Sequence, residues 1–383
     1  MNILFVTLFP LENNTSVTKS NYGIIKGLMD LGHQITIMMP KMSLKNGSYD
    51  AAYNLETCKI IRIGGKPFGE IAPMNNVGTL WYKIKHKLHK EFDILDITKV
   101  YLTEADKISI PNEKFDVVIS TSDPKTSHLF VKRLIARGLK YDRWIQHWGD
   151  PLNGDITRKN CYPDKVIQWY EKRIIKCADK VIYVSPFTAE VQKRVYPQFA
   201  TKILFVPLPC EENNEIEDRK RDGDKLRLSY LGDYNLAIRD IRPLYETCCE
   251  SKDVDLTIAG HSGLKLKERK NVHIYPRVPL ARVREIEQGA DVLVSVGNLR
   301  GTQIPGKIYY TAATNKHILV IVDGDNIEEM KAYLNQYRRF IVCDNNVESI
   351  KMVIEKIKGL QSTDYETPSV LIPRNNAKII LGL

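Results

Sequence analysis

Residues 292–322 read VLVSVGNLRGTQIPGKIYYTAATNKHILVIV, and this stretch contains the pattern on which the fold prediction rests. Two short apolar runs, at 292–296 and 318–322, are typical of buried strands. Between them lie a Pro-Gly-Lys turn and a helical stretch that ends near Thr314. A strand, a helix and a second strand in this order form a crossover unit, which joins parallel strands of one sheet. The stretch therefore predicts a parallel sheet covered by helices.

The same alternation of strand and helix signals runs along most of the chain, which is typical of doubly wound α/β folds. Clear helical periodicity occurs at 21–31 and 163–177. The expected strands of the first half are 3–7, 34–39, 116–120, 143–147, 181–184 and 203–206, and those of the second half are 226–231, 256–259, 272–275, 292–296, 318–322 and 340–343.

Residues 208–225 are polar, charged and aperiodic, as linkers are. We therefore expect two tandem Rossmann-like domains, at 1–207 and 226–360. In such domains ligands bind at the carboxyl ends of the strands, so we expect these ends to face a shared cleft. Residues 361–383 form a tail that either extends over the surface or packs back on the first domain.

The composition is that of a soluble globular protein, with 43% hydrophobic and 27% charged residues. No run reaches the ~18 apolar residues of a membrane span, and the N-terminal strand lacks the basic flank of a signal peptide. Seven cysteines without a C-x-x-C pair fit a reducing cytoplasm, so we expect a cytoplasmic protein. The net charge of +10 favours phosphorylated small molecules or anionic lipid as partners. We expect no nucleic acid partner, because no RNA-binding or zinc-finger pattern is present.

The segment Gly301-Thr-Gln-Ile-Pro-Gly306-Lys307 is the strongest local signal. A proline in the first turn, a glycine and a lysine at a helix start suit a phosphate or diphosphate group. The segment nearly matches a Walker A loop, but Ile308 stands where the Mg²⁺-ligating hydroxyl belongs, which disfavours a P-loop kinase or triphosphatase. An ordinary proline-initiated helix start is the alternative.

Polar and glycine residues also follow several expected strands. His147 and Asp150 end the stretch RWIQHWGDP, where they suit a sugar hydroxyl or a proton transfer, although a capped turn would explain them too. Gly232 and Gly260 follow strands of the second domain, where a missing side chain lets the backbone approach a ligand.

Residues 81–92, from Trp81 to Phe92, combine an apolar helical face with many lysines. Such a helix either lies on an anionic membrane surface or packs its apolar face on the domain core. His86 and His89 lie within this basic run and are not expected to bind metal. The motif Asp323-Gly324-Asp325 follows a strand and is better explained as a turn, so we expect no metal and no cofactor.

Taken together, these segments resemble the GT-B glycosyltransferases, in particular the family-4-like enzymes of bacterial surface polysaccharide assembly. The likeness spans nearly the whole chain. Residues 119–124, ISTSDP, and the segment from Trp144 to Pro151 resemble the strand tips of the acceptor domain. Residues 271–279, NVHIYPRVP, are similar to the family's nV-x-F-x-G-x-V segment, and residues 303–318, QIPGKIYYTAATNKHI, to its QIPGK-[IL]-[FY]-E-Y-L-A-x-x-K-P-I stretch.

The resemblance implies that the C-terminal domain binds a nucleotide-sugar donor. Arg239 and Lys307 would neutralise the leaving diphosphate, and His147 and Asp150 would lie near the transferred sugar; these four are the expected catalytic residues. The expected donor-binding residues are Gly232, Asp233, Gly260, His261, Val278, Gln303, Ile304, Pro305, Gly306 and Tyr310. The expected acceptor-binding residues are Thr15, Ser16, Ser122 and Trp148.

One departure from the family pattern leaves two functions open. The family's ribose-binding glutamate falls at Tyr310, and the other member of its E-x7-E pair falls at Thr302. The main expectation is a metal-independent hexosyltransferase that moves a sugar from a UDP- or GDP-type donor to a glycan or lipid-linked acceptor in capsule or lipopolysaccharide synthesis. The resemblance alone implies retention. The alternative is a non-catalytic GT-B scaffold or partner subunit.

Overall fold

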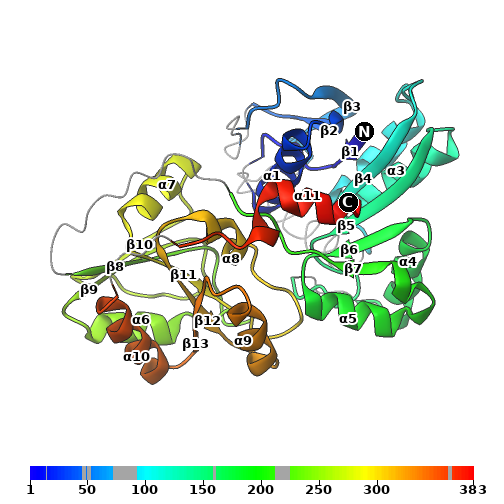
Figure 1. The fold of residues 1–383 in the computed structure, drawn as a ribbon. Coiled ribbons are helices and arrows are strands. Elements are labelled where there is room, and N and C mark those ends of the chain that lie inside the picture. Colours follow the sequence, from blue (N-terminus) through cyan, green and yellow to red (C-terminus); the bar gives the residue numbers. More distant parts are fainter. Residues whose placement is uncertain are drawn as a thin grey trace, which may run out of the picture. The chain divides into compact units, whose positions relative to one another are not determined.

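The computed structural model describes residues 1–13, 15–44, 49, 53–71, 93–157, 161–211, 225–360 and 365–383. The chain divides into two compact units, the first formed by Met1–Leu208 with Pro373–Leu383 and the second by Pro209–Ile372. Each unit is a parallel sheet with helices packed on it (Figure 1). The prediction of two Rossmann-like α/β domains is confirmed. The predicted basic helix at 81–92 and most of the predicted linker lie outside the described residues.

The first unit contains a sheet whose central strand, β1 (Asn2–Val6), pairs with β2 on one side and β4 on the other. Within the described residues the strand order is β3-β2-β1-β4-β5-β6-β7. The other strands are β2 (Gln34–Met42), β3 (Lys59–Phe68), β4 (Phe115–Ser122), β5 (Tyr141–Trp148), β6 (Lys180–Tyr183) and β7 (Ile203–Phe205).

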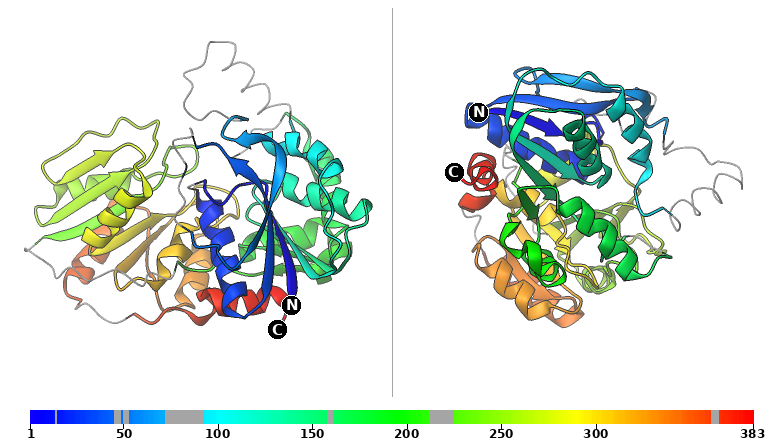
Figure 2. Two further views of the ribbon diagram at one scale, coloured as in Figure 1. Left: turned by 90° about the horizontal axis from the view of Figure 1, so that it is seen from above. Right: turned by 90° about the vertical axis from the view of Figure 1, so that its right-hand side faces the viewer.

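Two hydrophobic cores cover the two faces of this sheet. The helices are α1 (Ser16–Asp30), α3 (Thr126–Ala136), α4 (Asp164–Ile175), α5 (Pro186–Val195) and α11 (Pro373–Leu381), with 3₁₀ turns at Ile97–Asp106 and Pro197–Lys202. Side chains from α3 and α4 enter one core and side chains from α1 and α11 the other. Figure 2 shows α1 (dark blue) and α3 (cyan) on opposite faces of the strands.

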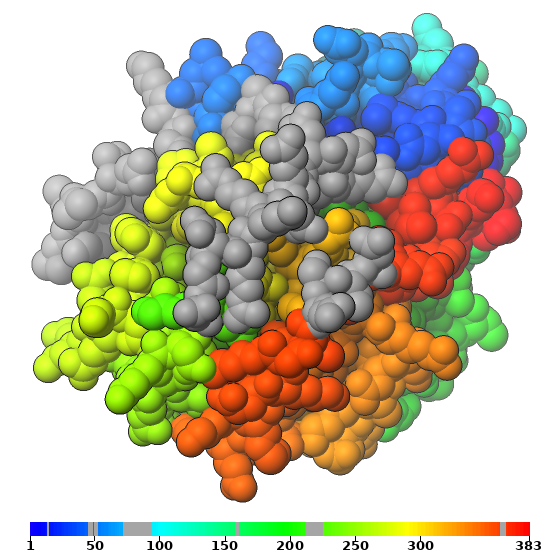
Figure 3. Space-filling model, turned by 60° about the vertical axis from the view of Figure 1, so that its left-hand side comes forward, coloured from blue at the N-terminus to red at the C-terminus, as the bar shows by residue number. Residues whose placement is uncertain are grey.

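The C-terminal tail ends in α11, which packs on α1 of the first unit (Figure 3, red against dark blue). The approach is close, because a Cβ at Gly27 would lie 2.0 Å from the carbonyl oxygen of Pro373. The amide of Asn376 donates to the carbonyl of Pro207 at 2.8 Å and so ties α11 to the end of the first unit. Of the two arrangements that the sequence left open for the tail, the structure has the packed one.

Two elements of the first unit differ from the sequence-based expectation. Helix α1 begins at Ser16 rather than near residue 21, because Thr15 caps it by accepting from the Thr18 amide at 3.3 Å. Strand β3 was missed altogether. It is an edge strand with a Gly-Gly pair and three basic residues, so it lacks the continuous apolar run of a buried parallel strand.

The second unit repeats the same construction. Within the described residues its order is β10-β9-β8-β11-β12-β13, all parallel. The strands are β8 (Leu226–Leu231), β9 (Val254–Ala259), β10 (Val272–Tyr275), β11 (Val292–Val296), β12 (His317–Val322) and β13 (Ile341–Asp344). The helices are α6 (Arg242–Glu250), α7 (Leu280–Gly289), α8 (Lys307–Tyr310), α9 (Ile327–Asn335) and α10 (Val347–Lys358), with 3₁₀ turns at Thr311–Ala313 and Ser369–Leu371.

Helix α8 is shorter than the sequence indicates, since one α-helical turn is followed directly by a 3₁₀ turn. The carbonyls at its end are held from outside the helix. The buried Arg339 donates to the carbonyl of Ala312 at 2.8 Å and to that of Lys316 at 3.0 Å. A helix of one turn carries only a small dipole, so it adds little to anion binding at Gly306.

Candidate functional site

Each sheet has one point at which the strand order reverses, and there the loops at the carboxyl ends of two strands diverge to leave room for a ligand. In the first unit this point lies between β1 and β4, and in the second between β8 and β11. Most residues singled out in the sequence follow these strands or their neighbours.

In the second unit, Arg239 joins the loops on both sides of the reversal point. Its guanidinium donates to the Asn298 side-chain oxygen at 2.8 Å and to the carbonyl of Asp233 at 3.2 Å. Asn298 in turn donates to the carbonyl of Gln303 at 3.0 Å. In the part of the chain that the structure describes, no carboxylate pairs with Arg239. The loops therefore hold an uncompensated cation in a fixed place.

The tips of β8 and β9 approach each other at the two predicted glycines. A Cβ at Gly260 would lie 2.1 Å from the carbonyl oxygen of Gly232, so no other residue fits there without movement. Gly232 itself has room, since its nearest contact would be 3.7 Å. The exposed Asp233 accepts from the His261 amide at 2.9 Å and pairs with Arg277 at 3.0 Å.

The Gln303–Lys307 segment follows the same reversal point. Gln303 and Ile304 are buried, whereas Pro305 and Gly306 are half-buried. Lys307 is not a free cation, because its ammonium pairs with the carboxylate of Glu287 on α7 at 2.9 Å.

The remaining predicted donor residues of this unit lie on two elements. Tyr310 is buried on α8, and its carbonyl accepts from the Glu211 amide at 3.1 Å. Val278 is half-buried, three residues after β10 ends.

In the first unit, a buried lysine lies among carboxylates at the tips of β4 and β5. The side chain of Lys125 is only 3% exposed, and its ammonium contacts Asp123 at 2.6 Å and Asp155 at 2.9 Å. Burial alone would lower the pKa of Lys125, but the charges of Asp123 and Asp155 outweigh it and raise that pKa. The lysine therefore stays charged and holds this corner of the sheet.

Asp150 lies in the same electrostatic environment. Burial, and then the charge of Asp123, raise the pKa of Asp150 to about 7. Burial likewise raises the pKa of Asp123, against the opposing charge of Lys125. Asp150 is therefore partly protonated near neutral pH and suits proton exchange or hydrogen bonding with a hydroxyl group.

Behind this cluster lies Glu171, which is fully buried on α4. It accepts from the amides of Leu152 and Asn153 at 2.6 and 3.3 Å and from the Tyr196 hydroxyl at 2.8 Å. Burial raises the pKa of Glu171 to about 7 in spite of these hydrogen bonds. Glu171 thus fixes the loop that follows Asp150.

His147 lies on the face of β5 that α1 and α11 cover, because it alternates with Ile145, a member of that core. It is 2% exposed, and burial lowers its pKa to about 4, so its ring is neutral. Thr121 is its register partner on β4. Among the described residues, neither ring nitrogen of His147 nor the hydroxyl of Thr121 has a hydrogen-bond partner, and all three atoms are buried. Such adjacent orphaned groups are typical of a place where a ligand or water binds.

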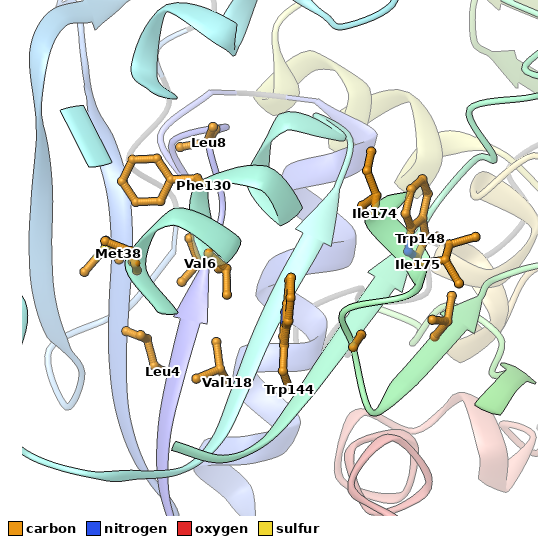
Figure 4. Close-up of a cluster of buried hydrophobic side chains, with 14 of the residues drawn as sticks. Leu4, Val6, Leu8, Met38, Val118, Phe130, Trp144, Trp148, Ile174 and Ile175 are labelled. Carbon is orange, nitrogen blue, oxygen red and sulfur yellow. The ribbon is translucent and has the colours of Figure 1, made fainter. Parts of the chain in front are cut away.

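The predicted acceptor residues occupy structural positions. The side chain of Thr15 is the cap of α1, and Ser16 is exposed in the first turn. The hydroxyl of Ser122 accepts from the Gly149 amide at 3.3 Å and so joins the tips of β4 and β5. Trp148 is fully buried beside Ile174 and Ile175 (Figure 4). The prediction that Trp148 binds the acceptor is wrong, because strand alternation turns its ring into the core.

Of the residues that matter most for this geometry, several were not singled out in the sequence. They are Thr121, Asp123, Lys125, Asp155 and Glu171 in the first unit and Arg277, Glu287 and Asn298 in the second. Asp123 lies in the quoted ISTSDP segment, so its place after a strand was a usable signal. The others carry no local pattern. No cluster of three or more His, Cys, Asp or Glu side chains arranged to hold a metal ion occurs among the described residues.

Comparison with known proteins identifies the fold. No protein-family model and no curated protein sequence matches the chain. Among solved structures, the catalytic domain of starch synthase IV from Arabidopsis thaliana, bound to ADP and acarbose, is similar with a TM-score of 0.60 at 8% identity, over 98% of this chain and 95% of that chain. Sucrose-phosphate synthase from Thermosynechococcus elongatus gives 0.57 at 12% identity, over 100% and 94%. Anabaena HepE, in complex with UDP and glucose, gives 0.54 at 13% identity, over 100% and 95%.

Proposed function

The chain has the GT-B fold, as its resemblance in sequence indicated. From this premise we propose that it is a glycosyltransferase that moves a sugar from a nucleoside diphosphate donor to a glycan or lipid-linked glycan acceptor. The observation that carries the proposal is the uncompensated Arg239 at the reversal point of the second sheet. The solved structures of HepE with UDP and of starch synthase IV with ADP have the same fold, which supports a nucleoside diphosphate donor.

The chemistry follows from the charge that develops in such a reaction. When the sugar–phosphate bond breaks, the diphosphate gains negative charge, and a cation already held in place stabilises it without reorganisation. Arg239 fits this role because Asn298 and the Asp233 carbonyl fix its orientation. Lys307 is the second cation, and Glu287 keeps it positioned. These cations replace a metal ion, so we propose metal-independent transfer.

The first unit would supply the acceptor side. Asp150 is suited to contact a hydroxyl because its pKa of about 7 lets it both donate and accept near neutral pH. His147 and Thr121 would donate to or accept from a sugar hydroxyl through the polar atoms that lack partners. We further propose a hexosyl donor, stereochemical retention, a role in surface polysaccharide synthesis and work at the cytoplasmic face of a membrane, all on the basis of the sequence resemblance. None of the described helices is long and apolar enough to span a membrane.

The test is release of nucleoside diphosphate from a panel of UDP- and GDP-hexoses, with and without EDTA. We expect turnover with one donor and no effect of EDTA. Substituting Arg239→Ala is expected to lower kcat by roughly 10²–10³, the usual loss when one group that stabilises the transition state is removed. Lys351→Ala, on the exposed face of α10, removes a positive charge elsewhere in the same unit and should leave kcat unchanged. Full turnover by Arg239→Ala would show that the leaving group is not stabilised there.

A second candidate function is a non-catalytic GT-B scaffold, which Tyr310 and Thr302 favour. A tyrosine hydroxyl cannot hold two ribose hydroxyls as a carboxylate does, and Tyr310 is buried within its unit. Donor binding alone would fit either function. Thermal stabilisation by a nucleoside diphosphate, without hydrolysis or transfer from any sugar nucleotide, would favour the scaffold.

A further inference from the structure

Helix α4 carries an exposed face that the fold does not use. Seven residues on the helix and its C-terminal cap are exposed, and one of them, Asp164 in the first turn, lies on another side of the helix. The other six are Lys165, Val166, Trp169, Lys172, Arg173 and Lys176. At about 100° of rotation per residue, they fall within roughly one third of the circumference. Ile167, Glu171, Ile174 and Ile175 lie on the remaining sector and are buried. The helix is thus amphipathic in an unusual way, because its exposed side is both basic and aromatic.

Trp169 is the prominent member of this face, which we call the α4 face. Its side chain is 55% exposed, whereas Trp144 and Trp148 of the same unit are buried. The guanidinium of Arg173 lies over its ring, 4.6 Å from the centroid. An indole has an apolar body and a polar N–H, so it is stable at a boundary between water and an apolar phase. A guanidinium stacked on the indole ring is stable at the same boundary.

The charge of the α4 face has one sign. Four of its six residues are cations and none is acidic. Lys165, Lys172, Arg173 and Lys176 form no ion pair with a carboxylate among the residues that the structure describes, so neighbouring side chains do not neutralise the charge of this face. Figure 1 shows α4 at the periphery of the first unit. An anionic surface is the partner whose charge complements this face.

We propose that the α4 face docks on the surface of a bilayer that contains anionic phospholipid. Trp169 and Val166 would enter the headgroup boundary, and the four cations would contact the lipid phosphates. Each basic residue near an anionic membrane contributes about 1 kcal/mol, or about fivefold in affinity. This surface is distinct from the segment 81–92 to which the sequence analysis pointed. The proposal deepens the proposed work at a membrane face but does not depend on transferase activity, so its failure would leave the proposed sugar transfer untouched.

Vesicle sedimentation of the full chain tests the charges. We expect binding to mixed phosphatidylcholine–phosphatidylglycerol vesicles and much weaker binding to phosphatidylcholine alone. The double substitution Lys172→Gln/Lys176→Gln should weaken binding about 25-fold, from two factors of about five. The matched control is Lys351→Gln/Lys356→Gln, which removes two exposed charges from α10 at the surface of the second unit (Figure 3). Its binding should equal that of the unmodified chain.

Tryptophan fluorescence tests the aromatic contact. In a Trp81→Phe background, Trp169 is the exposed indole that remains, since Trp144 and Trp148 are buried. Its emission should shift to shorter wavelength when vesicles are added, and Trp169→Ser should lose both the shift and most of the binding. The control Met352→Ser removes another exposed apolar side chain, from α10, and should bind normally.

Three results would overturn the proposal. The first is unchanged vesicle binding by the charge and Trp169 variants, which would favour contact through 81–92. The second is equal binding to neutral and anionic vesicles. The third is a protein that self-associates in sedimentation velocity and becomes monomeric on Trp169→Ser, which would make a second copy of the chain the partner.

Discussion

The cluster at the tips of β4 and β5 gives the most demanding prediction, the substitution Lys125→Met. Methionine keeps much of the length and apolar character of the side chain but removes the charge. Asp123 and Asp155, whose oxygens lie 2.6 and 2.9 Å from the ammonium, would be left without a counter-charge. Removing one partner of a buried ion pair costs about 3–5 kcal/mol. For a unit of this size that corresponds to a fall in Tm of roughly 6–20 °C.

The loss should depend on pH in a defined direction. In the native protein burial raises the pKa of Asp155, but Lys125 and hydrogen bonds from Thr157 outweigh it, so the pKa is lowered. This group contributes stability above its unfolded pKa. Without Lys125, burial is opposed by the hydrogen bonds alone and the pKa rises. The variant then loses stability as pH increases, so its deficit relative to the unmodified chain should be smaller at pH 5 than at pH 8.

Urea unfolding at these two pH values measures the effect, with the fluorescence of the buried Trp144 and Trp148 as the signal. The control is Lys193→Met, which breaks the exposed pair with Glu190 and should cost about 0–1 kcal/mol at either pH. A loss below about 1 kcal/mol for Lys125→Met, or the same loss at both pH values, would refute the described role of the buried lysine.

The other predictions concern single positions in each unit. Glu171→Gln keeps an acceptor for the Leu152 amide but removes a group whose pKa burial raises to about 7. The stability that Glu171 contributes is present below about pH 4.5 and is lost as pH rises through 7, by up to about 3 kcal/mol. Tm should therefore fall more over this range in the native chain than in the variant, which keeps Asp150 with its raised pKa; equal slopes would contradict this. Gly260→Ala should lower Tm strongly, because the new Cβ would lie 2.1 Å from the carbonyl oxygen of Gly232. The control Gly263→Ala places its Cβ in open space and should leave Tm nearly unchanged. Equal Tm values for the two variants would show that the tips of β8 and β9 can separate.

The strand bounds predicted from the sequence agree well with the structure in the second unit. Strands β8, β10 and β11 have the bounds that the sequence pattern indicated. For β8 and β11, which lie inside the sheet, the reason is that parallel strands buried on both faces read as continuous apolar segments. The same reasoning failed for β3, whose edge position permits polar residues. It placed the start of α1 too late because a threonine cap carries no periodicity.

The site was predicted less completely than the fold. Gly260 and Arg239 were singled out because turns need glycine and a leaving group needs a cation; the structure places both at the tips of the second sheet, and the role of Arg239 stays a prediction. The ion pairs of Lys125 could not, because Asp155 comes from a loop 30 residues away and no spacing rule links the two. Trp148 was misjudged for a related reason. A strand-end position shows which loop a residue borders, but the face to which its side chain points depends on the register of the whole strand.

Under the proposed function, Tyr310, which stands where the sequence resemblance implies a glutamate, changes where donor affinity can come from. A carboxylate accepts from two ribose hydroxyls, and charged hydrogen bonds are worth about 1.5–3 kcal/mol each, whereas a phenol offers one neutral bond worth about 0.5–1.5 kcal/mol. Asp233 at the tip of β8 and Asn298 in the loop after β11 hold Arg239, and Glu287 on α7 holds Lys307. Under the proposed function, recognition of the donor therefore shifts from the ribose to the diphosphate. This explains how a chain without the carboxylate pair can still bind a nucleotide sugar, since a diphosphate offers charge that both cations can meet.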